Sequence, residues 1–92
     1  MNSMKLKDNL AVRKIGNEYM MVSESGSGLD YTRVISLNSS AAYLIEKVGH
    51  NIFTEDEWVE LLIEKYGIAR EIAQTDVNNL IEKLQIENLL ES

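Results

Sequence analysis

The sequence lacks cysteine and proline altogether among its 92 residues. Without cysteine the chain can form no disulfide, no thiolate metal site and no cysteine nucleophile. Its apolar runs are only a few residues long, far short of the roughly 20 residues that a membrane-spanning helix needs. The N-terminus also lacks the apolar stretch of a secretory signal peptide. We therefore expect a soluble cytoplasmic protein with no membrane segment.

What is present is the composition of an ordinary globular protein, 45% hydrophobic and 26% charged. A chain of this length has room for one domain, 1–92, in which residues 1–5 are a polar lead-in that can be frayed or disordered. The net charge of −6 is unevenly distributed, because residues 38–92 carry four Lys or Arg against eleven acids. DNA phosphates must be neutralised by cations, so this acidic half argues against a nucleic acid partner.

The first third of the chain has the pattern of β-strands. The β-prone segments 10–15 and 18–23 are separated by Gly16 and Asn17, which can supply the positive φ of a two-residue hairpin turn. The Gly/Ser-rich stretch 23–32 predicts a loop longer than a tight turn. A third strand is predicted for residues 33–37, and in a three-stranded meander this strand lies at an edge.

Helical periodicity predicts three helices after these strands. The first begins after the capping residue Asn38 and ends at Gly49. The third covers about residues 70–85, and Asn88 can then adopt the left-handed conformation. One stripe of this helix is apolar: Ala73, Val77, Leu80, Ile81 and Leu84. The order βββααα predicts an α+β fold, a three-stranded antiparallel sheet followed by three helices, as in a winged helix-turn-helix.

The second helix has the strongest local signal in the chain. Thr54 and Glu57 have the spacing of a capping box, in which each side chain bonds the backbone N–H of the other residue. Phe53 before the cap and Trp58 after it have the spacing of a hydrophobic staple. The apolar face of the helix continues through three residues that we expect in the core: Leu61, Leu62 and Tyr66.

Several short segments follow one another in a family-like order from about residue 5 to residue 91. They are Leu10-x-Val12-Arg13, the strand-to-helix junction 35–41, Tyr66, the helical residues Asp76, Val77, Leu80, Ile81 and Leu84, and the closing Leu89-Leu90. With these segments the chain resembles the coenzyme PQQ synthesis protein D (PqqD) family. The resemblance implies a RiPP recognition element, a non-catalytic winged-helix domain without cofactor or metal. Such a domain binds the leader region of a ribosomally made precursor peptide and presents it to a radical-SAM/SPASM maturase.

The resemblance also implies where the leader binds, namely as an added strand in the groove between the third strand and the third helix. The expected site residues are Arg33, Val34, Ile35, Ser36 and Leu37 on the strand, and Asp76, Val77, Leu80, Lys83 and Leu84 on the helix. Because strand side chains alternate, we expect Ile35 and Leu37 to point inward. Arg33 and Lys83 can meet acidic leader residues or be solvated, and Asp76 can face the groove or bond locally.

Three other functions are alternatives to this one. A DNA-binding regulator would read DNA with segment 70–91, which carries two basic residues against five acids. The edge strand can also pair with its own copy, as in a homodimer or a general interaction module. An enzyme is not indicated, since His50 has no grouped ligands and the acids of segment 55–57 suit a helix N-terminus. The sequence leaves open the precursor, the maturase and whether the product is PQQ.

Overall fold

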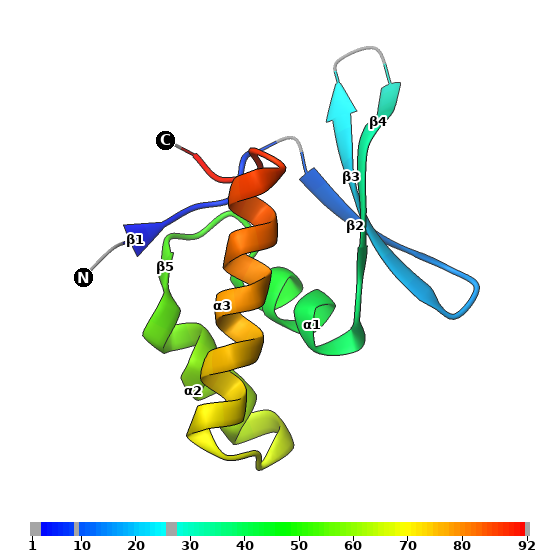
Figure 1. Ribbon diagram of the computed structural model, residues 1–92. Coiled ribbons are helices and arrows are strands. Elements are labelled where there is room, and N and C mark those ends of the chain that lie inside the picture. The colour runs from blue at the N-terminus through cyan, green and yellow to red at the C-terminus, as the bar shows by residue number, and fades with distance from the viewer. Residues whose placement is uncertain (1–2, 9, 26–27, 92) are drawn as a thin grey trace.

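The computed structural model describes residues 3–8, 10–25 and 28–91, with side chains described outside 23–34. Figure 1 shows a sheet and a group of three helices joined at the end of the last sheet strand. The sheet has the order β2-β3-β4 and is antiparallel throughout. Its strands and the helices after it are β2 (Leu10–Ile15), β3 (Glu18–Ser25), β4 (Gly28–Leu37), α1 (Ser39–Val48), α2 (Glu55–Tyr66) and α3 (Arg70–Ile86). The predicted βββααα arrangement is confirmed, with β4 at one edge.

The hairpin between β3 and β4 is longer than the sequence analysis predicted. Residues 23–32 were expected to form a loop, but β3 continues to Ser25, which pairs with Gly28 at the start of β4. That prediction was wrong, because polar residues can extend a ladder when the two backbones satisfy each other's hydrogen bonds. Residues 26–27, the middle of the predicted loop, lie outside the described part of the chain.

A break in register divides β4 into two parts. Met21 pairs with Ile35, whereas Ser23 pairs with Asp30, so the four β4 residues 31–34 lie opposite Val22 alone. Such extra residues bend a strand and increase its twist. The last part of β4, which leads into α1, therefore runs in a different direction from the part that starts at Gly28.

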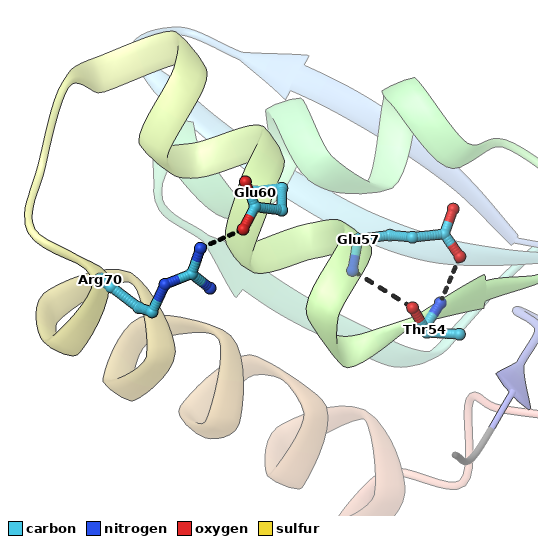
Figure 2. A network of polar contacts seen from close by, with 4 residues as sticks. All are labelled: Thr54, Glu57, Glu60 and Arg70. Carbon is cyan, nitrogen blue, oxygen red and sulfur yellow. Dashed lines mark hydrogen bonds and ion pairs between the residues drawn. The ribbon is translucent and has the colours of Figure 1, made fainter.

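Local side-chain bonds start the first two helices as predicted. Asn38 Oδ1 accepts a hydrogen bond from Ala41 N at 2.8 Å at the start of α1. Figure 2 shows the capping box of α2, in which Glu57 N donates to Thr54 Oγ1 at 3.2 Å and Thr54 N donates to Glu57 Oε1 at 3.1 Å. The predicted staple is also present, since the buried rings of Phe53 and Trp58 stack with their centroids 4.1 Å apart.

The α2–α3 turn depends on Gly67, which has a φ of 64° and ends α2 in the left-handed conformation. Across this turn Arg70 forms an ion pair with Glu60, also drawn in Figure 2. Both side chains are largely exposed, so the pair contributes at most about 1 kcal/mol. Tyr66 was expected in the core but is 43% exposed, and its ring lies edge-on to Tyr43 at 6.3 Å.

The N-terminal segment 5–7 and the C-terminal segment 89–91 lie side by side (Figure 1). Asn88 has a φ of 57°, and the tail after it turns back so that Leu90 bridges Leu6. Residues 1–5 were expected to be a lead-in that can be frayed, yet β1 (Ser3–Met4) pairs with β5 (Phe53–Thr54) in a second, two-stranded sheet. In the described residues we found no helix that is long and apolar enough to cross a membrane.

Candidate functional site

A hollow of about 150 Å³ lies where the end of β4 meets α1 and α3. Its wall combines the end of the edge strand, the first turns of α1, one residue of α2 and one face of α3. The lining residues are Ser36, Leu37, Asn38, Ser40, Ala41, Leu44, Leu62, Asp76, Asn79, Leu80 and Lys83. Of the ten site residues predicted from the sequence, the structure gathers five here: Ser36, Leu37, Asp76, Leu80 and Lys83.

The hollow has an apolar floor and a polar rim. Its aliphatic lining residues are all buried, Leu44 and Leu62 to 1% exposure and Leu37 and Leu80 to 7%. The exposed residues of the rim carry hydroxyl, amide or charged groups: Ser36, Asn38, Asp76, Asn79 and Lys83. The floor of such a site can hold an apolar side chain, and the polar groups of its rim can form hydrogen bonds with the peptide backbone next to that side chain.

The rim on the strand side is the open edge of β4. Lys83 Nζ, from α3, donates a hydrogen bond to the Ser36 backbone oxygen at 3.2 Å. In an antiparallel pair a residue either exchanges both backbone bonds with its partner or directs both away from it. Lys83 reaches this carbonyl from outside the sheet, so we infer that the N–H and C=O of Ser36 face the open side of the sheet.

The face of α3 toward the hollow differs from its core face. Asp76, Asn79, Leu80 and Lys83 line the hollow at i, i+3, i+4 and i+7 spacing. Val77 and Leu84, which the sequence analysis placed in the site, have 0% exposure and lie in the core. Leu80 belongs to both faces, since it packs in the core and also lines the hollow.

Strand β4 carries the other predicted residues. Ile35 and Leu37 are buried and Ser36 is exposed, so the predicted alternation is confirmed. Arg33 and Val34 lie in the stretch of β4 without a paired residue on β3, and their side chains are outside the described part. The groove was expected along residues 33–37. In the described part of the chain, only the last two residues of β4, Ser36 and Leu37, line it.

The chain's own tail does not lie along this edge. Lys7 N donates to Leu89 O at 3.1 Å and Glu91 N donates to Lys5 O at 2.7 Å, which fixes the tail against the N-terminal segment. The α3 helix packs chiefly against α2, whereas the sheet contacts α1. Within the described residues, the hydrogen bond that crosses the rim from α3 to the β4 backbone is the one from Lys83.

The sequence reasoning missed Asn38, Ser40, Ala41, Leu44, Leu62 and Asn79 as lining residues. Asn79 had a usable signal, because it lies on the same helical face as Asp76 and Lys83. The others come from α1, α2 and the cap between β4 and α1, and their place beside α3 depends on tertiary packing. Among the described residues there is no group of three or more His, Cys, Asp or Glu that could hold a metal ion.

Comparison with protein families gives a match to the model described as coenzyme PQQ synthesis protein D (PqqD), over residues 18–90. This range contains β3, β4 and all three helices, and so the whole wall of the hollow. A search of curated proteins found no match.

Solved structures with the same fold cover nearly the whole chain. One is described as "Lasso peptide synthetase B1 complexed with the leader peptide", at 19% identity, TM-score 0.66, and coverage of 97% of this chain and 98% of the other. A second is "TbiB1 in Complex with the TbiA(beta) Leader Peptide", at 19% identity, TM-score 0.68, and coverage of 97% and 96%. A third, from Methylobacterium extorquens, is a stand-alone RiPP recognition element, the PqqD truncation of PqqCD, at 15% identity, TM-score 0.70, and coverage of 98% and 89%.

Proposed function

The chain belongs to the coenzyme PQQ synthesis protein D (PqqD) family, and from this premise we propose that it binds the leader region of a ribosomally made precursor peptide. The leader adds as a strand to the open edge of β4 and passes over the hollow beside α3. The observation that carries the proposal is the Ser36 carbonyl at the edge of β4, which accepts a hydrogen bond from the Lys83 side chain rather than from a further strand, next to an apolar floor. Two solved structures of the same fold are complexes of a protein with a leader peptide, which supports the proposal.

Backbone pairing at the edge of β4 gives the leader its position but little affinity. Each hydrogen bond contributes about 0.5–1.5 kcal/mol net, while ordering each peptide residue costs about 1–2 kcal/mol. The free energy gained from backbone hydrogen bonds along β4 is therefore smaller than the conformational entropy cost of ordering the peptide that forms them. Side chains of the leader must supply the difference by burial.

The hollow has the size for one such side chain. Its volume of about 150 Å³ equals that of an engineered apolar cavity that binds benzene. One branched aliphatic or aromatic residue of the leader therefore fills it. Burial of that residue contributes about 1.5–3 kcal/mol, which changes the dissociation constant by about tenfold to a hundredfold.

We assign the protein a binding role without catalysis, as a partner of the enzyme that modifies the precursor. The residues that line the hollow include neither His nor Cys, and the aliphatic floor of the hollow suits the recognition of a side chain. The partner enzyme that we propose is the radical-SAM maturase implied by the family. Mixing the protein, its leader and the maturase encoded nearby should give a ternary complex on size-exclusion chromatography, and a leader that never enters that complex would contradict this partner.

A DNA-binding function finds less support. Both basic residues of α3 are engaged within the protein, Arg70 with Glu60 and Lys83 with the Ser36 carbonyl. The other charged residues of α3, Glu71, Asp76 and Glu82, are acidic and exposed, which opposes approach to phosphate. A homodimer formed through β4 would use the edge that we assign to the leader, so sedimentation with and without peptide distinguishes the two.

Two adjacent asparagines on α3 offer a direct test. Asn79 lines the hollow, whereas Asn78 is exposed on the other side of α3 beside Glu82 and Gln85. Asn79→Trp places a large ring at the rim of the hollow and should weaken leader binding at least tenfold, because the anchoring side chain loses its place. Asn78→Trp makes the same change in size and polarity and should bind like the wild type.

Binding is measured by fluorescence anisotropy with the synthetic leader of a precursor encoded beside the gene. The same peptide, added to labelled protein, should shift the amide signals of residues 35–37 and 76–83. Thermal unfolding of both variants controls for folding. Equal binding by the two variants, or shifts confined to other residues, would contradict the proposed site.

A further inference from the structure

The groove between β4 and α3 carries two opposite charges at separate positions on one helical face. Asp76 and Lys83 are the charged residues among those that line the hollow. They are seven residues apart on α3, which places them about 10.5 Å apart along the helix axis. Both are exposed at the rim, so their charged groups are available to a peptide that crosses the hollow.

Lys83 stands at the point where an added strand would begin to pair. Its ammonium donates to the Ser36 oxygen at 3.2 Å, the same carbonyl that would accept an N–H from a leader on the open edge. When the peptide N–H takes over this acceptor, the ammonium is free to turn toward the peptide. A carboxylate of the leader is the group that best accepts a bond from it, since charge-assisted bonds are stronger than neutral ones.

We infer that Asp76 and Lys83 determine the specificity and direction of the bound leader by selecting a pair of opposite charges in it. This inference rests on the proposed leader-binding function. An acidic leader residue lies at Lys83, a basic one lies at Asp76, and the anchoring apolar residue lies between them over Leu80. An extended chain rises about 3.3 Å per residue and alternate side chains share a face, so two charges that flank the anchor on one face are four residues apart, about 13 Å along the peptide.

The order of the two charges gives the peptide a direction. A backbone strand can add to an edge in either orientation, and an apolar anchor alone does not distinguish the two. With an anion fixed at the Ser36 end of the groove and a cation fixed at the Asp76 end, one orientation satisfies both charges and the reverse places like charges together. Each matched charge should change the dissociation constant by about twofold to fivefold, the range of an exposed ion pair.

A charge exchange tests this inference without altering the net charge. The doubly substituted variant Asp76→Lys with Lys83→Asp keeps the composition of the groove but reverses its polarity. A phage-displayed library of random 16-residue peptides is selected on the wild type and on this variant. Peptides selected on the wild type should carry an acid and a base around an apolar residue in one order, and those selected on the exchanged variant should carry them in the opposite order.

Matched controls separate groove charge from overall charge. Lys83→Glu should select peptides with a base in place of the acid, whereas Lys47→Glu, in the last turn of α1 and outside the hollow, makes the same change in net charge and should select wild-type-like peptides. Peptides that shift the amides of residues 35–37 but show no charge order, or the same order on both proteins, would overturn the inference and leave leader binding intact. If no selected peptide shifts those amides, the proposed function itself fails.

Discussion

Replacing Ser36 by proline removes one backbone N–H from the open edge of β4 and little else. The residue is exposed and lies opposite Met20 of β3 in the register, and its carbonyl accepts a hydrogen bond from Lys83. Its flanking residues Ile35 and Leu37 pair with Met21 and Tyr19 on β3, so the ladder inside the sheet keeps its own donors. Proline is tolerated on edge strands where its missing N–H would face away from the sheet.

The size of the effect follows from the number of bonds lost. One N–H donor to the leader is removed, which is worth about 0.5–1.5 kcal/mol, and the dissociation constant should therefore rise roughly twofold to tenfold. The free energy of unfolding should change by less than about 1 kcal/mol, because no buried contact is altered and proline restricts the unfolded chain.

Calorimetric titration of the leader into Ser36→Pro and Ser36→Ala provides the measurement. The alanine variant keeps the N–H and loses the hydroxyl, so it should bind like the wild type. Thermal unfolding of both variants shows whether the fold is retained. The reasoning is refuted if Ser36→Pro is folded and binds with wild-type affinity, or if Ser36→Ala weakens binding as much as the proline variant does.

Two predictions concern the frame that holds the groove. Thr54→Ala removes the acceptor of Glu57 N in the α2 capping box and should destabilise the fold by about 1 kcal/mol, with a fall in Tm of about 4–8 °C in a thermal scan; an unchanged Tm would contradict a contribution from the cap. Leu84→Ala should cost about 2–5 kcal/mol in denaturant unfolding, because Leu84 is fully buried in the core. A stable Leu84→Ala variant that has lost only leader binding would place Leu84 in the groove instead.

Local signals in the sequence were sufficient to predict those structural features that involve only residues a few positions apart. The cap at Asn38, the capping box at Thr54 and the left-handed Asn88 each involve atoms no more than a few positions apart. The alternation that buries Ile35 and Leu37 has a period of two and is read directly from the chain. The number, type and order of the main elements follow from signals of this kind.

Prediction from the sequence failed where the secondary structure depends on pairing between distant segments. The stretch 23–32 has loop-like residues, yet most of it is strand because β3 and β4 satisfy each other's backbones. The N-terminal residues Ser3 and Met4 carry no strong strand signal, and they form β1 because β5 lies beside them. Local propensity is a weak guide when a neighbouring strand supplies hydrogen-bond partners.

By itself, then, the sequence determined the order of the three sheet strands and three helices, the helix boundaries and the edge position of β4, since these follow from short-range bonds and periodicity. Only the tertiary structure decided which face of α3 meets that edge. The apolar stripe that contains Val77 and Leu84 was the obvious candidate for the groove. Because burial of apolar area is favourable, this stripe instead packs in the core. The neighbouring face with Asp76, Asn79 and Lys83 remains for the groove, and Lys83 reaches a carbonyl 47 residues earlier in the chain.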